Sequence, residues 1–306
     1  MDVRQLSAIV AIADHGTFSA AARALYTVQS NVSGHIARLE KELGVTLVDR
    51  AMGGLTDDGA RVVERARRVL NEIDDISADV GSRSENVSGQ VRLGVIGTTA
   101  RWLMPALLTA LHDRHPHVRT IVQEGATSTI VPNVASADLN AGIVHLPIDD
   151  PDLVVDPLFA EDLMLLVPAG HPLHGNDPAP VAAIDAIPLP PPPTGSALRT
   201  VLVRAAAAAN VRLRAQAEID GVGLIASLAS DGFGAAIVPA TATPRRRTGD
   251  FSMIPVPELP RRVVAVVRRR RPAPSSATQA LLETLRDVVG DEARRQPGVH
   301  SETVPT

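Results

Sequence analysis

Residues 19–47 carry the pattern that most restricts how this chain can fold. The segment reads SAAARALYTVQSNVSGHIARLEKELGVTL, with a short Ala-rich run followed by a break at Tyr26-Thr27. Beyond the break, apolar residues recur every three or four positions, as on the side of a helix that packs against a core. They are Val28, Val32, Ile36, Leu39 and Leu43. The pattern predicts two short helices joined by a tight turn.

The opposite side of the second predicted helix carries short hydrogen-bonding side chains and a cation. They are Gln29, Ser30, Asn31, Ser33, His35 and Arg38. Such side chains suit a helix in the major groove of DNA, where they read donors and acceptors on base edges. An ordinary solvated polar face has the same composition, so periodicity alone leaves both interpretations open.

Several short motifs surround this segment in a fixed order: MDVRQL, HGTFSAAARAL, QSNVSGHIARLEKELG, LVDR and LTDDG. Through these motifs, residues 1–59 resemble the winged helix-turn-helix domain of LysR-type transcriptional regulators. The resemblance implies that double-stranded promoter DNA is a partner. It also places the polar face of the second helix in the groove and Arg50 on a backbone phosphate.

Three positions depart from the pattern of that family. Val28 stands where the family has a capping serine, and Gly34 stands where it commonly has a basic residue. The wing after Arg50 (AMGG) is short and lacks an arginine. A glycine inside a helix also costs about 1 kcal/mol relative to alanine. These departures keep an alternative open, namely a small-molecule-binding protein with weakened DNA binding.

Residues 58–80 show a different periodicity, which predicts one long helix. Its apolar residues alternate between spacings of four and three, as in the seam of a coiled coil; they are Val62, Ala66, Val69, Ile73, Ile76 and Val80. So narrow a stripe favours a partner helix over packing within its own domain. In the LysR-type family this is the linker helix (here 60–80) that pairs two subunits. The resemblance therefore implies a homodimer, which pairs further into a homotetramer.

Short apolar runs alternate with helical patterns from residue 91 onward, after a polar hinge at 81–90. This alternation predicts an α/β domain with a largely parallel sheet. The runs VRLGVIGTTA, LPIDD, PLFAEDLMLLVPAGHPL and EIDGVGLIASLASDGFGAAIVP resemble the LysR-type effector-binding domain, whose two lobes are similar to periplasmic binding proteins. The overall fold class is thus α/β, with an all-α N-terminal domain. We expect lobe I at 91–161 and 267–290, lobe II at 162–266, and a flexible tail at 291–306.

A cleft between two such lobes is the expected place for a small ligand. Threonines and serines follow predicted strands there and begin predicted helices, where free amide groups favour a carboxylate. As an alternative, these hydroxyls only cap helices, and a lone histidine is more often structural than a ligand contact. The family resemblance implies an effector site made by Thr98, Thr99, Thr127, Ser128, His145, Ser196 and Asp220.

Composition narrows the remaining functions. The 306 residues include no cysteine, which excludes thiol catalysis and a disulfide switch within the chain. His112, His115 and His117 have no carboxylate partner at ligand spacing, so we expect neither a metal nor a cofactor. We find no catalytic motif and no apolar run that could span a membrane, and we expect a cytoplasmic protein. An enzyme built on the two-lobed fold is the weakest alternative. We therefore predict a DNA-binding transcriptional regulator controlled by a small molecule.

Overall fold

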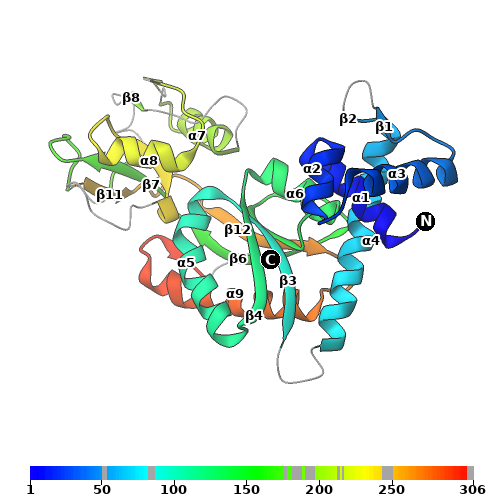
Figure 1. Ribbon diagram of the computed structural model, residues 1–306. Helices are drawn as coiled ribbons and strands as arrows, with labels where there is room; N and C mark the ends of the chain where they lie inside the picture. The colour runs from blue at the N-terminus through cyan, green and yellow to red at the C-terminus, as the bar shows by residue number, and fades with distance from the viewer. Residues whose placement is uncertain are drawn as a thin grey trace.

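The computed structural model describes residues 1–49, 54–81, 87–175, 178–180, 188–189, 197–211, 214–215, 217–242 and 251–301. It confirms the fold class: an α-helical N-terminal domain, a long linker helix, and a two-lobed α/β domain (Figure 1). Arg50, the wing residues 51–53, Ser196 and residues 82–86 of the hinge lie outside the described residues. No helix among the described residues is long and apolar enough to cross a membrane.

The N-terminal domain packs three helices around one apolar core: α1 (Val3–His15), α2 (Phe18–Ala24) and α3 (Gln29–Leu43). Asp2 and Gln5 form a capping box that fixes the start of α1, and Thr17 caps α2. Strands β1 (Val48–Asp49) and β2 (Gly54–Leu55) pair antiparallel after α3. Val28 precedes α3 without a side-chain cap, and the first turn is held instead by hydrogen bonds of Gln29 to Ser19 and of Asn31 to Thr27.

The linker helix α4 (Asp57–Gly81) leaves this domain and leads to lobe I. Its N-terminal part belongs to the core of the N-terminal domain, where Val63 and Ala66 are buried. Figure 1 shows α4 running beside the sheet of lobe I, at the opposite side of the molecule from lobe II. The helix therefore contacts two domains along its length.

Lobe I is built on a six-stranded sheet with the order β13-β6-β12-β5-β3-β4. The strands are β3 (Ser88–Val95), β4 (His117–Glu124), β5 (Ala141–His145), β6 (Leu153–Glu161), β12 (Arg262–Arg269) and β13 (Val299–His300). Helices α5 (Gly97–Arg114), α6 (Thr127–Ala135) and α9 (Ser276–Arg295) pack against it. In this sheet only β3 pairs in parallel, with β4 and β5, while β12, β6 and β13 pair antiparallel. The prediction of a largely parallel sheet is thus wrong, because three strands enter or leave lobe I through lobe II or the C-terminal segment.

Lobe II contains a smaller antiparallel sheet of order β10-β7-β11. Its elements are β7 (Leu163–Pro168), β8 (Pro188–Leu189), α7 (Ala197–Ala208), β9 (Arg214–Ala215), α8 (Val222–Ser230), β10 (Ala236–Pro239), the 3-10 helix η2 (Ala240–Ala242) and β11 (Phe251–Pro255). The chain returns to the lobe I sheet at Arg262, where β12 begins, which is earlier than the predicted boundary at 266.

Residues 291–301 differ from the flexible tail predicted for 291–306. Helix α9 continues to Arg295, and β13 then joins the edge of the sheet by pairing with β6. Ala293 and Val299 are buried in the core of lobe I. Two buried apolar side chains and a strand pairing hold the segment in place, a signal too short to stand out in the sequence.

Candidate nucleic-acid interface and ligand cleft

Helix α3 exposes the polar face that the sequence predicts. Its buried residues Val32, Ile36 and Leu39 fix the rotation of the helix against the domain core. Gln29, Ser30, Asn31 and Arg38 are consequently exposed, while Ser33 and His35 are half-buried.

Hydrogen bonds hold several of these side chains in position. The Ser19 hydroxyl of α2 donates to Gln29 Oε1 at 2.8 Å. Arg38 Nη2 lies 3.0 Å from His35 Nδ1. The groups that would read bases are therefore partly ordered before DNA binds, which reduces the entropy lost on binding.

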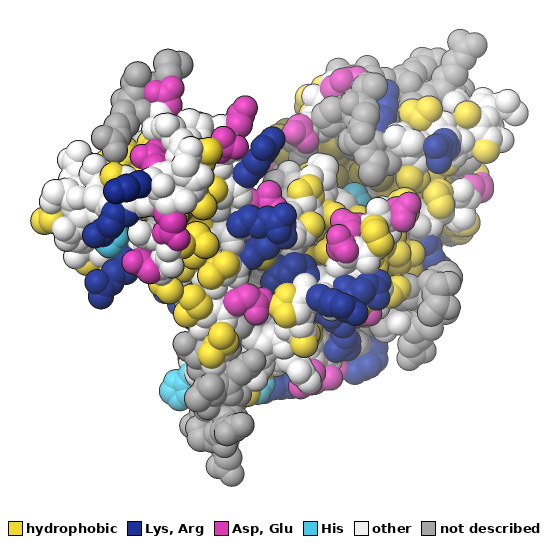
Figure 2. Space-filling model, turned by 90° about the vertical axis from the view of Figure 1, so that its right-hand side faces the viewer, with side chains coloured by type: hydrophobic (Ala, Val, Ile, Leu, Met, Phe, Trp, Pro, Cys, Tyr) yellow, Lys and Arg dark blue, Asp and Glu magenta, His cyan; other side chains and the backbone are white. Residues whose placement is uncertain are grey.

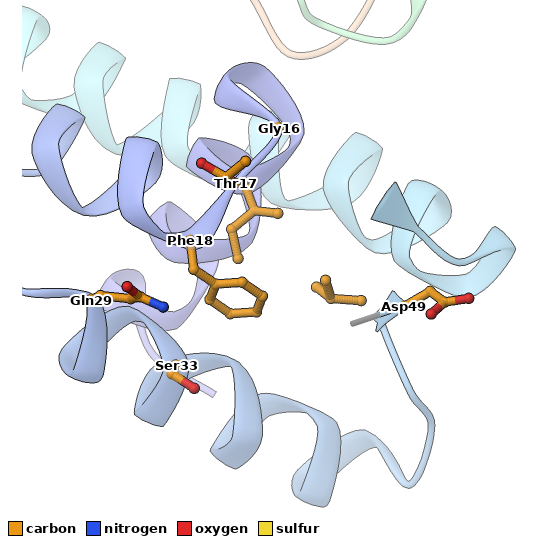
Figure 3. A pocket seen from close by; sticks show the side chains of 8 residues that line it. Gly16, Thr17, Phe18, Gln29, Ser33 and Asp49 are labelled. Atoms are coloured by element: carbon orange, nitrogen blue, oxygen red, sulfur yellow. The ribbon is translucent and has the colours of Figure 1, made fainter. Parts of the chain in front are cut away.

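A hollow of about 280 Å³ adjoins this face. Figure 3 shows Gln29 and Ser33 of α3 on one side, Thr17 at the start of α2 on another, and the Phe18 ring between them. Asp49 of β1 lies at the far end. The α3 face is thus bordered by the first turn of α2, and both helices present polar groups to the same side.

Charge is mixed on the molecular surface. Figure 2 shows Lys and Arg side chains gathered across the middle of one face, with Asp and Glu side chains between them. The chain carries a formal net charge of −4. The net charge therefore gives no indication of DNA binding, and any phosphate contacts depend on where individual cations lie.

The linker helix exposes part of its predicted apolar stripe. Ala66 is only 1% exposed and Val62 packs against the N-terminal core, whereas Val69 is 44% and Ile76 is 62% exposed. Ile73 is half-buried, and the side chain of Val80 lies outside the described residues. A groove of about 450 Å³ runs along this side of α4, lined by Met1, Leu6, Leu43, Arg61, Val62, Glu64, Arg65, Ala66 and Val69.

The second site is a cleft of about 700 Å³ between the two lobes. It lies at the carboxyl ends of β3, β4 and β5 and at the N-termini of α5, α6 and α8. Its lining is Ile96, Gly97, Thr98, Arg101, Glu124, Gly125, Ala126, Thr127, Ser128, His145, Leu146, Pro147, Leu198, Asp220, Gly221, Val222, Gly223 and Arg262. The structure thus brings together Thr98, Thr127, Ser128, His145 and Asp220 of the predicted residues.

Thr99 is the described residue of that prediction that does not line the cleft. Its side chain is fully buried behind the first turn of α5. Arg101, Glu124 and Arg262 also line the cleft, although no sequence motif singles them out. Arg101 is one turn beyond Thr98 on α5, a spacing that could have identified it. Arg262 comes from the returning strand β12, which no local motif connects to the cleft.

Each of the helices α5, α6 and α8 begins at the cleft without a side-chain cap. The residues that precede them are Ile96, Ala126 and Gly221, none of which offers a capping oxygen. Free backbone N–H groups and the positive ends of helix dipoles attract anions. The convergence of uncapped helix ends makes this cleft suited to a carboxylate.

Arg262 connects the cleft to a buried carboxylate. Its Nη2 donates to Thr98 Oγ1 at 3.1 Å and pairs with Glu161 Oε1 at 2.5 Å. Glu161 is fully buried, and its other oxygen accepts from the backbone N (3.0 Å) and hydroxyl (2.8 Å) of Thr241. Because the charge of Arg262 is already balanced by Glu161, the guanidinium offers the cleft hydrogen-bond donors more than net charge.

His145 is neutral in the cleft. Burial, followed by the nearby charge of Arg262, lowers its pKa from 6.5 to about 4. Its Nδ1 lies 3.3 Å from Thr127 Oγ1. A neutral imidazole has one donor and one acceptor nitrogen, and because Nδ1 contacts Thr127, only Nε2 is left for a ligand, as donor or as acceptor according to the tautomer.

Arg101, Glu124 and Asp220 also face the cleft, and within the described part of the chain none of the three makes an ion pair or side-chain hydrogen bond. Arg101 of lobe I lies against Gly223 of lobe II, where a Cβ atom would come within 1.7 Å of Nη1. Gly223 therefore permits the close approach of the two lobes at this point. Among the residues that the structure describes, these three leave one cation and two carboxylates available to a ligand.

A helix-turn-helix with an exposed polar face, a long linker helix and a two-lobed domain with a polar cleft together define a ligand-controlled DNA-binding regulator. The chain belongs to the LysR family: residues 3–60 match the bacterial regulatory helix-turn-helix protein of the lysR family, and residues 84–290 match the LysR substrate binding domain. It is therefore a DNA-binding transcriptional regulator with a C-terminal effector-binding domain.

Similar proteins span nearly the whole chain. A probable hydrogen peroxide-inducible genes activator of Streptomyces viridosporus is 30% identical over 299 residues, covering 94% of both chains. The DNA-binding transcriptional dual regulator OxyR of Escherichia coli (strain K12) is 27% identical over 290 residues, covering 94% of this chain and 95% of OxyR.

Solved structures have the same fold. A full-length OxyR from Pseudomonas aeruginosa, in a variant with one cysteine replaced by aspartate, has a TM-score of 0.77 and 24% identity, covering 100% of this chain and 99% of that one. Full-length CbnR in complex with its target DNA has a TM-score of 0.71 and 22% identity, covering 94% and 100%. These likenesses support the arrangement of the domains.

The lowered pKa of His145 generates a prediction about stability and pH. An unfolded histidine binds a proton near pH 6.5, but folded His145 does so only near pH 4, so its contribution to stability is present above 6.5 and is lost as the pH falls towards 4. The His145→Asn variant lacks the titrating imidazole. It therefore loses less stability than the wild type when the pH is lowered from about 7 to about 5. Urea denaturation at the two pH values measures the difference. Equal losses in both proteins would contradict the buried, neutral assignment.

Proposed function

We propose that this regulator reads its promoter with α3 and responds to a carboxylate-bearing small molecule that binds between the two lobes. The proposal of a carboxylate-bearing ligand rests on one observation. Three uncapped helix N-termini converge on one cleft, together with Thr98, Thr127 and the Arg262 guanidinium. Ligand binding then changes the relative free energies of alternative arrangements of the subunits, and with them the spacing or bend between DNA contacts.

We infer that peroxide is not the signal, although several similar proteins are named hydrogen peroxide-inducible genes activators. The solved relatives include OxyR variants in which a cysteine has been replaced. This chain has no cysteine at any position. It therefore has no thiol to oxidise and no pair of thiols to form a disulfide.

The free carboxylates narrow the class of ligand further. Glu124 and Asp220 face the cleft beside Arg101 and the helix N-termini. A ligand with only negative charge would gain at the helix ends but be repelled by both carboxylates. A molecule that carries a carboxylate and an amino group, such as an α-amino acid, satisfies both kinds of partner.

The ligand proposal is tested with matched pairs of small molecules. Each common α-amino acid is compared with the 2-hydroxy acid that bears the same side chain, by the shift each causes in the thermal unfolding midpoint. At least one amino acid raises the midpoint, its hydroxy acid raises it less, and Glu124→Gln reduces the difference. Hydrogen peroxide is the negative control. Equal shifts from both members of every pair would rule out a role for the amino group.

The DNA proposal is tested on the DNA upstream of the regulator's own gene, against a scrambled duplex. Gln29→Ala combined with Ser33→Ala lowers affinity for the promoter only, because a good bidentate base contact, such as a glutamine makes with adenine, is worth about 1–3 kcal/mol. Affinity for scrambled DNA and the slope with salt stay the same, since phosphate contacts are retained. Gln279→Ala, an exposed glutamine on α9, is the matched control.

Unchanged promoter affinity in the double variant would exclude α3 as the reader. If the wild type shows no salt-sensitive binding at all, the alternative of a small-molecule-binding protein with weakened DNA binding becomes the better description. Gly34 and the uncapped start of α3 at Val28 are the features that would then explain it.

We also propose that α4 pairs with the α4 of a second copy, and that two such dimers form a tetramer. Val69 and Ile76 expose large apolar side chains on a helix whose groove is lined mainly by apolar residues. The pairing would bury this stripe and present two α3 helices to two half-sites.

Ile76→Arg tests the pairing because it places a charge in the middle of the proposed seam. Analytical ultracentrifugation is expected to show a shift from the wild-type assembly towards smaller species, since a buried unpaired charge is strongly unfavourable. Val203→Arg, which replaces a side chain of α7 that is 47% exposed, is the control and leaves the assembly unchanged. The pairing is wrong if the two variants sediment alike.

A further inference from the structure

Helix α6 reaches from the cleft to the linker helix. Its first turn contributes Thr127 and Ser128 to the cleft wall. Its last residue, Ala135, is followed by Ser136, Ala137 and Asp138, which contact α4. We refer to residues 136–138 as the α6 corner. Figure 1 shows α6 between the sheet of lobe I and the N-terminal domain.

The α6 corner is held by side chains from adjacent turns of α4. Arg67 Nη1 pairs with Asp138 Oδ1 at 2.9 Å, and Arg68 Nε donates to the backbone oxygen of Ser136 at 3.4 Å. Asn71 Nδ2 donates to the backbone oxygen of Ala137. Side chains from α4 thus bind every residue of the corner.

These contacts extend in two directions. Arg67 also pairs with Asp14 of α1, so one guanidinium joins the DNA-binding domain, the linker helix and lobe I. Asn71 is buried, and its Oδ1 accepts from Arg92 Nη1 of β3 at 2.7 Å. The side chains that hold the corner therefore have direct polar links both to α1 and to strand β3 of the sheet.

Helix α6 packs closely on the sheet at two glycines. Ile130 and Val134 of α6 are buried against Gly94 of β3 and Gly142 of β5. A Cβ atom at either glycine would come within 2.7 Å or 2.5 Å of Ile130 Cγ2. Because the packing leaves no space for a Cβ atom at either glycine, α6 lies directly on the backbone of the sheet, and close packing of this kind transmits a displacement along the helix as one body.

We propose that α6 carries the state of the cleft to the linker helix, with Arg67, Asn71 and Asp138 as the positioning residues that receive it. This inference rests on the proposed ligand site, because Thr127 and its partner His145 form the cleft end of the same helix. A change at Thr127 moves the α6 corner, and the corner moves α4 through its polar contacts. The DNA-binding domain follows because Arg67 also holds Asp14.

The experiment perturbs the cleft without a ligand and observes α4 by hydrogen exchange in the full-length protein. Thr127→Val removes the hydroxyl at the cleft end of α6, and Thr98→Val removes an equivalent hydroxyl from α5, which does not end at the α6 corner. Thr127→Val is expected to change amide exchange in residues 64–72 by roughly two- to thirtyfold. Thr98→Val leaves that segment unchanged.

The effect of Thr127→Val on amide exchange in α4 should disappear when the ion pair between Arg67 and Asp138 is removed. In the Asp138→Asn background, which keeps the shape of the side chain but not its charge, Thr127→Val no longer alters exchange in 64–72. Asp138→Asn alone leaves the unfolding midpoint nearly unchanged, because a partly exposed ion pair contributes little to stability. A merely structural role would lower the midpoint and leave the response intact. Thr127→Ser serves as a milder second variant if Thr127→Val does not fold.

The proposal is overturned if both cleft variants change α4 equally, if neither changes it, or if the response survives in Asp138→Asn. Because the readout needs no ligand, these outcomes are separate from failure of the proposed ligand site. If only the proposed ligand site is wrong, the matched-pair binding assay gives a negative result while Thr127→Val still changes hydrogen exchange in α4.

Discussion

The buried carboxylate of Glu161 is the interaction on which the arrangement of the two lobes depends. It ends β6, the strand by which the chain leaves lobe I, and it binds Thr241 of η2 and Arg262 at the start of β12. The segments by which the chain leaves and re-enters lobe I thus meet at one fully buried charge. Removing one partner from such a buried pair typically costs about 3–5 kcal/mol, because the other charge is left uncompensated. Arg262 carries this constraint into the cleft through Thr98.

The sequence predicted most strongly what local periodicity encodes. The spacing of Val32, Ile36 and Leu39 fixed which side of α3 is exposed, and the motifs after β3 and β4 located Thr98 and Thr127 in the cleft. It did not predict what depends on distant pairing. Arg262 and Glu161 meet only after the chain has passed through lobe II and returned, and β13 is recognisable only from its pairing with β6. Neither contact has a local pattern.

The chain shares the fold of its relatives but contains no cysteine. A chain can be 30% identical to a probable peroxide-responsive activator over nearly all its length and still have no thiol. Identity at that level preserves the core and the lobe arrangement, while the cleft residues are free to serve another ligand. Here Arg101, Glu124 and Asp220 are charged groups of the cleft lining, to which the proposed ligand would be complementary.

Helix α4 has two opposite faces with different surroundings, and a movement of the helix would affect both. At about 100° per residue, Arg67 and Asn71 lie within about 40° of each other around the helix, whereas Val69 and Ile76 lie about 160° to 180° away from Arg67. The first pair binds the α6 corner, and the second is exposed and would meet the partner helix in the proposed dimer. A shift that the corner imposes on α4 is therefore imposed on the seam as well. Since each α4 would carry its own DNA-binding domain, one occupied cleft would change the separation of two α3 helices.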